Sequence, residues 1–494
     1  MKKVLCVLII AACLGSAGCS RKQVGETING LEPVTLQFIF LDSKFSATDQ
    51  VWNAIADRFR NELNVYFDIQ AIPLGDYKDR MLVKFAAGEV WDLNFDGDWL
   101  QYYQANAMNG YMDLTDLLPL YAPDLYRAYQ SSGALEEAKI NGRVYSLPWG
   151  ITQTHRPFFG WRGDLAPDID PSAVSTVEDV ERVVYDLRQR YPDRFILARF
   201  AMEPLYGKHD LIGAGYEFAF NINDPSMQIM HFAETAAYLE GAQYAEKWQR
   251  DGIIRADVLV DQLDENWLVS QGRQIAYWAT HEGSISQFAY IEPDVTMNYA
   301  LLYPDKKFPV RSFLGNVMGI PRTYKNAERT LMFLNLLETS QELYDMVMYG
   351  IEGVTYVKDT TKPNTVMFPP GMDTNNSNFM CWLGQWGLYK PQFMRGDPWW
   401  AEGFWEGERE FVQSNPTNIT SPLEGFNFVI DGFENEVAQM SAIFTAADKM
   451  FTVGMAGDSQ RAITQLINDL NRAGLSRVKT EYQRQIDVFM ASKR

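Results

Sequence analysis

The sequence predicts an α/β protein of two lobes with a helical C-terminal part. From residue 34 onward a strand, a helix and a second strand are expected, because the apolar spacing changes from two to about three and a half and back. The chain has 494 residues, well above the roughly 250–300 at which a single hydrophobic core stops growing. Near its end, residues 434–490 keep apolar side chains at helical spacing.

Residues 1–18 are expected to form a cleaved export signal, because two lysines, an apolar stretch and four small residues precede Cys19. The apolar stretch is shorter than the roughly 20 residues that a membrane span needs. Residues 16–19, Ser-Ala-Gly-Cys, resemble a bacterial lipoprotein box, which implies that Cys19 is lipidated and begins the mature chain. The resemblance departs at Ser16, where that family usually has Leu. Ordinary secretion with cleavage near Ala17 is therefore the alternative.

The composition argues against nucleic-acid binding and against a disulfide in the body of the protein. The chain has 63 acidic and 44 basic residues, a net charge of −19. Nucleic acid would be repelled, because its binding depends on Lys and Arg that neutralise phosphates. Cys381 is the one cysteine after Cys19, so packing must stabilise the body without an intramolecular disulfide.

The sequence predicts no cofactor and no metal site. The four histidines are far apart and lack the spacing of a zinc site. Residues 92–98 alternate Asp and Asn like the start of a calcium loop, but its twelfth position is Tyr103, which does not supply the usual carboxylate. No Gly-x-Ser-x-Gly elbow or Gly-Lys-Thr phosphate loop was found.

The first lobe is predicted to open with a β-α-β unit, which implies parallel strands and a right-handed crossover. Asn141-Gly142 predicts a hairpin turn at the end of this lobe. In the second lobe, Ser175 and Glu178 are spaced as a capping box for a helix that runs to about residue 190. The remaining expected elements are a helix at 77–87, a short strand at 91–96, a helix at 230–250, strands at 271–280 and 316–320, and a helix at 327–349.

These elements predict the following organisation. A signal occupies 1–18, a flexible tether 19–33, the first lobe 34–150 and 308–357, the second lobe 151–307, and an aromatic-rich segment with a helical module 358–494.

Several stretches together resemble the extracellular solute-binding proteins, family 1, of sugar ABC transporters. They are QGRQIAYWATHEG at 271–283, NVMGIPRTYKNAERTLMFLNLL at 316–337, and the tail strings MYGIEGVTYV, GQWGLYKPQF, SPLEGFNF and LNRAGLSRVKTEYQRQIDVFM. The tail strings are similar to a helical C-terminal module of one subgroup. The resemblance implies a two-lobed fold of the type II periplasmic-binding-protein kind, and capture of an oligosaccharide in a cleft between the lobes.

Sugar recognition needs flat apolar faces together with planar polar groups, and this directs the choice of candidate residues. Asp96, Asp98 and Trp99 follow a predicted strand, and open α/β sheets bind ligands at such strand ends. Asn316 is expected where the returning strand faces the cleft. Trp149 and Trp161 flank the predicted lobe crossing with His155 between them, and the three are expected to line the hinge; packing between the lobes is the alternative.

Further candidates lie in the second lobe and in the C-terminal part. Trp278 and Glu282 end the strand where the resemblance implies a ligand-binding aromatic residue. Tyr356, Trp382 and Gln385 lie in the aromatic-rich segment, where they either close the cleft or cover the core of the module.

The preferred function is that of a lipid-anchored receptor which binds an oligosaccharide, closes by hinge bending and docks on the transmembrane subunits of an ABC permease. We expect a non-enzymatic monomer, exported and held at the outer face of the cytoplasmic membrane or in the periplasm. One alternative is a surface lipoprotein glycoside hydrolase that uses an Asp/Glu pair, since 63 carboxylates permit one. Another is a structural or assembly lipoprotein.

Overall fold

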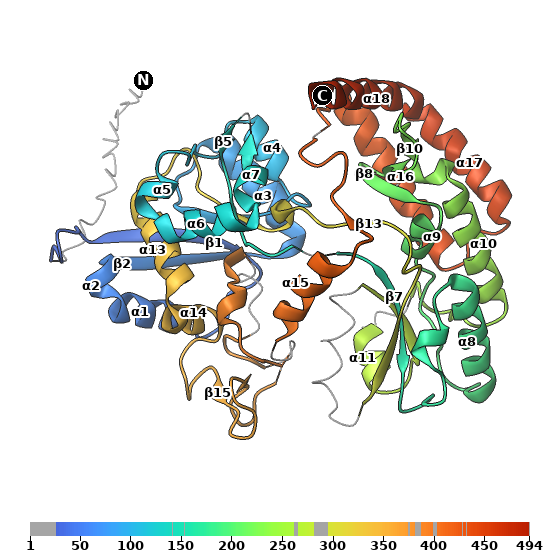
Figure 1. Cartoon of the computed structure of the whole chain (residues 1–494), viewed down its shortest axis with the longest axis horizontal. Coiled ribbons are helices and arrows are strands. Elements are labelled where there is room, and N and C mark those ends of the chain that lie inside the picture. The colour runs from blue at the N-terminus through green and yellow to red at the C-terminus, as the bar shows by residue number, and fades with distance from the viewer. Residues whose placement is uncertain are drawn as a thin grey trace, which may run out of the picture.

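The computed structural model describes residues 26–493 except 141, 153, 261–264, 281–294, 374–375, 381–386, 399–402, 427 and 431. Figure 1 shows two lobes side by side, with β1 and α13 (Ala327–Thr339) in one and β7 and α8 in the other. Each lobe has its own cluster of buried apolar side chains. The predicted α/β fold of two lobes is confirmed.

The first lobe is built on a five-stranded sheet in the order β2-β1-β3-β14-β6. β1 pairs in parallel with β2 over its whole length and with β3, as the β-α-β pattern predicts, and β14 returns antiparallel between β3 and β6. The strands are β1 (Val34–Leu41), β2 (Val65–Ile72), β3 (Leu93–Asp96), β6 (Leu147–Pro148) and β14 (Val317–Gly319).

Helices cover both faces of this sheet, with α1 on one side and α3 on the other (Figure 1). The helices of the lobe other than α13 are α1 (Thr48–Arg58), α2 (Arg60–Leu63), α3 (Leu74–Ala87), α4 (Tyr102–Ala107), α5 (Leu118–Tyr121), α6 (Pro123–Ser132), α7 (Ala134–Glu137) and α14 (Gln341–Met348). The predicted hairpin is present as β4 (Lys139–Ile140) paired with β5 (Arg143–Val144).

The start of the described chain is held against the first lobe. Asn64 donates from Nδ2 to the carbonyls of Glu26 (2.9 Å) and Leu31 (2.7 Å), and Ile28 pairs with Leu31. Residues 26–33, predicted as part of a flexible tether, are therefore fixed to the fold, while residues 1–25 lie outside the described part.

The second lobe contains two three-stranded antiparallel sheets, β11-β7-β12 and β10-β9-β8. Its strands are β7 (Pro157–Arg162), β8 (Leu211–Gly215), β9 (Phe218–Asn221), β10 (Met230–His231), β11 (Ala276–Thr280) and β12 (Met297–Leu301), and its helices are α8 (Val177–Arg190), α9 (Glu203–Lys208), α10 (Ala236–Arg250) and α11 (Glu265–Ser270).

Two helix starts in this lobe differ from the prediction. The capping box of α8 is formed by Thr176 and Asp179, one residue later than predicted, which places Val177 in the core. The helix predicted from residue 230 begins at Ala236, because Thr235 caps it and residues 230–231 pair with β9 instead.

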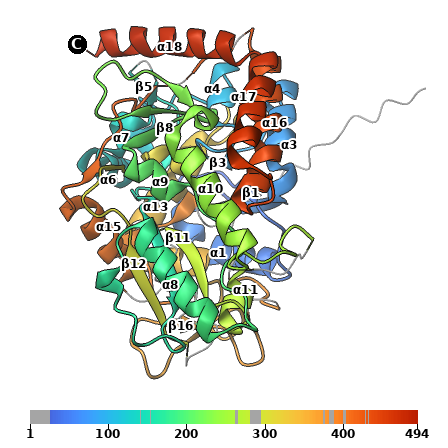
Figure 2. The same cartoon turned by 90° about the vertical axis from the view of Figure 1, so that its right-hand side faces the viewer.

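The C-terminal part is divided between the lobes rather than forming one module from residue 358. Residues up to Leu388, including the short strands β15 (Val357–Lys358) and β16 (Val366–Met367), contribute to the core of the first lobe. The last helices, α16 (Glu434–Thr452), α17 (Ser459–Arg472) and α18 (Leu475–Ser492), pack on the second lobe, where α16 and α17 contact α10 (Figure 2).

The chain therefore passes between the lobes three times, through residues 149–156, 303–316 and 415–423, which we call the lobe junction. Thr154 pairs with Val310, and β13 (Phe308–Pro309) pairs in parallel with β17 (Asn418–Ile419), so the three segments lie side by side. α15 (Phe404–Ser414) precedes the third passage and lies between the lobes in Figure 1. Among the described residues no helix is long and apolar enough to cross a membrane.

Candidate functional site

Predicted residues from three separate stretches of the chain meet beside the lobe junction. Trp99 follows β3, and its Nε1 donates to the carbonyl of Gly315 (2.8 Å) and to Oδ1 of Asn316 (3.2 Å). Asn316 also accepts at its carbonyl from the backbone N–H of Trp149 (3.2 Å). Trp99 keeps 41% of its surface exposed, so an indole whose N–H is already hydrogen-bonded remains partly accessible to solvent.

Charged side chains lie on the same part of the junction. Arg311 Nη2 is 3.6 Å from Oδ1 of Asp98, and its Nη1 is 3.2 Å from Nε2 of His155. Burial raises the pKa of Asp98, and the Arg311 cation opposes that rise. Asp98, Trp99, His155, Arg311 and Asn316 form what we call the junction cluster. It joins the carboxyl end of a first-lobe strand to two of the three segments that lead to the second lobe.

An aromatic stack adjoins the cluster. The rings of Trp149 and Tyr389 lie 5.9 Å apart at 21°, and Trp149 shares a small apolar cluster with Ile151 and with Phe404 of α15. Only 5% of Trp149 is exposed. The predicted alternative for this residue, packing at the lobe junction, therefore describes its present contacts.

Arg156 binds the three segments of the junction to one another. The side chain is fully buried and its guanidinium lies 4.9 Å from the ring centre of Phe308. Burial lowers its pKa to about 10, so it remains charged near neutral pH. It donates to Oδ1 of Asn418 (2.7 Å), to the carbonyls of Lys306 (3.3 Å) and Pro304 (3.5 Å), and to Oγ1 of Thr417.

Two further carboxyl groups, of Glu137 and Glu424, interact electrostatically at the junction. Glu137 of α7 accepts from Ser312 Oγ (2.7 Å) and from the N–H of Phe313 (2.6 Å). Burial raises the pKa of Glu137, and it raises that of Glu424 to about 7, with the Glu137 carboxylate as the next cause. A carboxyl group of the first lobe and one of the C-terminal part are thus both partly buried at the junction.

The chain resembles known proteins in both sequence and fold. A carbohydrate ABC transporter substrate-binding protein of Streptococcus pneumoniae is 24% identical over 98% of this chain and 96% of its own length. The crystal structure of the N-glycan transport solute-binding protein NgtS from the same species matches with a TM-score of 0.74 and 21% identity, over 94% of this chain and 100% of NgtS. The chain has the fold of the two-lobed solute-binding proteins. The resemblance predicted from the sequence is confirmed.

A second structure extends the likeness. An HMO-binding, ABC-transporter associated solute-binding protein from Bifidobacterium longum infantis matches with a TM-score of 0.63 and 13% identity, over 93% of this chain and 99% of that one. Residues 422–491 match a family described as a domain of unknown function, DUF3502. This span includes α16, α17 and α18, the helices that pack on the second lobe.

Asp96 lies beneath the junction cluster rather than in it. Its carboxylate is fully buried and accepts from the N–H groups of Gly97 (2.7 Å) and Gln101 (3.2 Å) and from the hydroxyl of Tyr111. Burial raises its pKa to about 7. The residue predicted as a ligand contact thus shapes the loop that presents Asp98 and Trp99.

Two predicted tryptophans face the core of the second lobe. Trp161 is fully buried on β7, the central strand of its sheet, so it does not line the hinge as predicted. Trp278 donates to the carbonyl of Arg199 (2.9 Å) and packs on Phe159 and on Trp248 of α10. Because side chains alternate along a strand, its neighbour Tyr277 points to the opposite face.

The remaining predicted residues lie apart from the cluster or outside the described residues. Tyr356 is 5% exposed, packs on Tyr349 and belongs to the first-lobe core, so it covers a core rather than a cleft. Outside the described residues lie Cys19, Glu282, Trp382 and Gln385.

Sequence reasoning missed the roles of Arg311 and Arg156. Burial and four hydrogen bonds show that Arg156 holds the segments of the junction together. A signal was present in the unbroken polar run next to a predicted crossing, TQTHR at 152–156. Among the described residues no group of three His, Cys, Asp or Glu side chains is placed to hold a metal ion.

Proposed function

We propose that this protein is the substrate-binding component of a carbohydrate ABC importer and holds an oligosaccharide between its two lobes. The observation that carries the proposal is the junction cluster, where an oriented indole, an amide and charged side chains meet on a two-lobed solute-binding fold. An indole face suits the C–H side of a sugar ring, and the polar groups suit its hydroxyls.

Closure of the lobes would couple capture to delivery. A ligand touched by both lobes gains contacts in the closed state that the open state lacks, and this difference in affinity shifts the population. NgtS offers a parallel. The TM-score of this chain is 0.74 against one NgtS structure, and 0.68 and 0.64 against NgtS in complex with Man1GlcNAc and Man5GlcNAc. An open lobe arrangement would account for that order.

The proposal includes the membrane context. Cys19 would carry a lipid that tethers the protein, a monomer, at the outer face of the cytoplasmic membrane or in the periplasm, and the closed form would dock on the transmembrane subunits of a permease. Each methylene buried in the bilayer would add about 0.8 kcal/mol of membrane affinity. The sugar passes on unchanged, so the proposal excludes the glycoside hydrolase alternative.

Intrinsic tryptophan fluorescence titrated with neutral oligosaccharides, Man5GlcNAc among them, tests the proposal. We expect saturable binding that weakens about tenfold or more in Trp99→Ala, the loss of one stacking and one hydrogen-bonding contact. Trp161→Phe is the matched control, because Trp161 lies in the core. No response to any glycan, or release of shortened glycans during the incubation, would overturn the proposal.

A further inference from the structure

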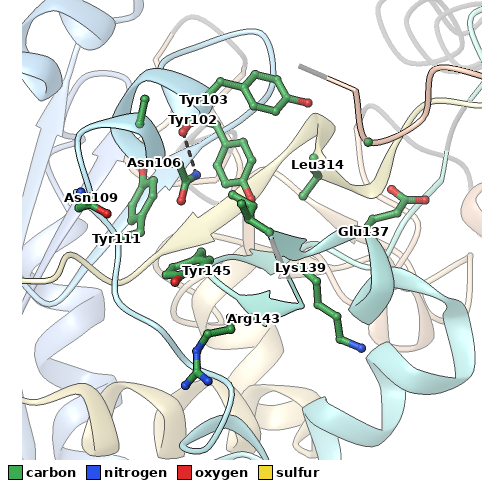
Figure 3. A pocket seen from close by; sticks show the side chains of 13 residues that line it. Tyr102, Tyr103, Asn106, Asn109, Tyr111, Glu137, Lys139, Arg143, Tyr145 and Leu314 are labelled. Carbon is green, nitrogen blue, oxygen red and sulfur yellow. Dashed lines mark hydrogen bonds between the residues drawn. The ribbon is translucent and has the colours of Figure 1, made fainter. Parts of the chain in front are cut away.

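The first lobe contains a hollow beside the lobe junction, with a volume of about 450 Å³. Its walls come from α4, from α7 and from the β4–β5 hairpin, while Leu314 of the junction and Gly425 of the DUF3502 span complete it (Figure 3). We call it the tyrosine pocket, because Tyr102, Tyr103, Tyr111 and Tyr145 all line it.

The charged side chains of the tyrosine pocket are already paired. Lys139 donates to Glu136 (2.6 Å), and Arg143 donates to Asp113. Glu137 accepts the two hydrogen bonds from Ser312 and Phe313 described above. No unpaired cation therefore lines the described walls to attract an anionic ligand.

Among the described residues, two of the four tyrosine hydroxyls of the pocket are paired and two are not. Tyr102 donates to Ser146 Oγ (3.2 Å) and Tyr111 donates to Asp96. Over the part of the chain that the structure describes, the hydroxyls of Tyr103 and Tyr145 have no hydrogen-bond partner, although both side chains are partly buried. Figure 3 places Tyr103 on the α4 side of the pocket and Tyr145 on the hairpin side.

We propose that the tyrosine pocket is a second binding site, for a neutral saccharide ring. Aromatic faces with unpaired hydroxyls and the nearby amides of Asn106 and Asn109 match the alternating apolar and hydroxylated surfaces of a sugar. The volume lies within the range of small-ligand sites, roughly 300–1,000 Å³. A carboxylated sugar is disfavoured, because the charges of Asp98, Glu137 and Glu424 act on Tyr103.

This inference goes beyond the proposed function and gives the DUF3502 span a role. Glu424 and Gly425 are among its first residues, and they reach the first lobe while α16, α17 and α18 pack on the second. The DUF3502 span packs on the second lobe, and its first residues would close a saccharide pocket of the first lobe.

Saturation-transfer NMR of the intact protein with methyl mannoside, methyl glucoside and N-acetylglucosamine tests the site, with glucuronate as the anionic comparison. At least one neutral sugar is expected to bind, and glucuronate about tenfold more weakly or not at all. Tyr103→Phe with Tyr145→Phe removes only the two hydroxyls and should weaken binding about tenfold. Tyr66→Ala on β2, the outer strand of the same lobe, is the matched control and should leave binding unchanged.

The two proposals fail separately. If Man5GlcNAc binds and the double tyrosine variant retains monosaccharide binding, the tyrosine pocket is overturned and the oligosaccharide site stands. If the variant loses monosaccharide binding while no oligosaccharide binds the wild type, the pocket stands and the proposed function fails. Absence of monosaccharide binding to the wild type overturns the pocket.

Discussion

Removal of the Arg156 side chain is expected to loosen the lobe junction measurably. Arg156→Ala breaks two close bonds, to Asn418 Oδ1 (2.7 Å) and to Thr417 Oγ1, and two longer ones to carbonyls. A hydrogen bond to a charged group contributes about 1.5–3 kcal/mol, and the longer bonds and the Phe308 contact add less. We therefore expect the free energy of unfolding to fall by about 3–5 kcal/mol, within the range of other disrupted buried polar networks.

The assay combines urea unfolding with the distance between two spin labels, one on each lobe. Arg156→Ala should lower the urea midpoint and broaden the distance distribution in the absence of ligand. Arg156→Lys keeps the charge but lacks the guanidinium fork, so it should recover only part of the loss. Arg162 is the matched control, since it is 8% exposed and binds Asp164 and two carbonyls entirely within the second lobe.

Arg162→Ala should therefore destabilise the protein without broadening the distance between the lobes. A double-mutant cycle of Arg156→Ala with Asn418→Ala should show a coupling energy of about 1–2 kcal/mol, as expected for residues in contact. The reasoning is refuted if Arg156→Ala leaves the urea midpoint unchanged, or if its lobe distances match those of the Arg162 control.

Three further outcomes are expected. Because burial and then the Glu137 carboxylate raise the pKa of Glu424 from 4.5 to about 7, the folded chain binds a proton that the unfolded chain releases, so this contribution to stability falls as the pH rises through that window. Melting temperatures measured from roughly pH 5 to pH 8 should show this slope. The slope should be smaller in Glu424→Gln but not zero, because the pKa of Asp96 is also about 7. An unchanged slope in Glu424→Gln would contradict the assignment. Trp161→Ala should cost about 3–5 kcal/mol by calorimetry through the cavity it leaves, and a near-neutral result would disagree with its full burial. Cys19→Ala should move the protein from the membrane fraction to the soluble fraction, and mass spectrometry of the wild type that found no lipid on Cys19 would remove the anchor.

Local patterns in the sequence were sufficient for much of the fold. The β-α-β opening, the return at β14 and the β4–β5 hairpin were predicted because period, turn residues and strand length act within a few residues. The start of α8 was missed by one position, since Ser175-Glu178 and Thr176-Asp179 fit the same capping pattern and only burial of Val177 decides between them.

The candidate site was predictable where it follows strand ends. Asp98, Trp99 and Asn316 meet beside the junction, as residues at the carboxyl edge of an open sheet should. The sequence does not show which face of its sheet Trp278 lies on, because buried side chains cover both faces. Only the folded structure shows that the face with Trp278 packs on α10. The third passage between the lobes was missed because β17 is two residues long and lies in a stretch without periodicity.

An odd number of passages between the lobes places the two ends of the chain on different bodies. The described chain begins against the first lobe, where Asn64 holds Glu26, and ends in α18 on the second lobe. An attachment ahead of residue 26 would then restrain the first lobe directly and leave the second, with its C-terminal helices, as the body free to swing. A permease facing such a receptor would meet one stationary surface and one whose position reports whether sugar has been captured.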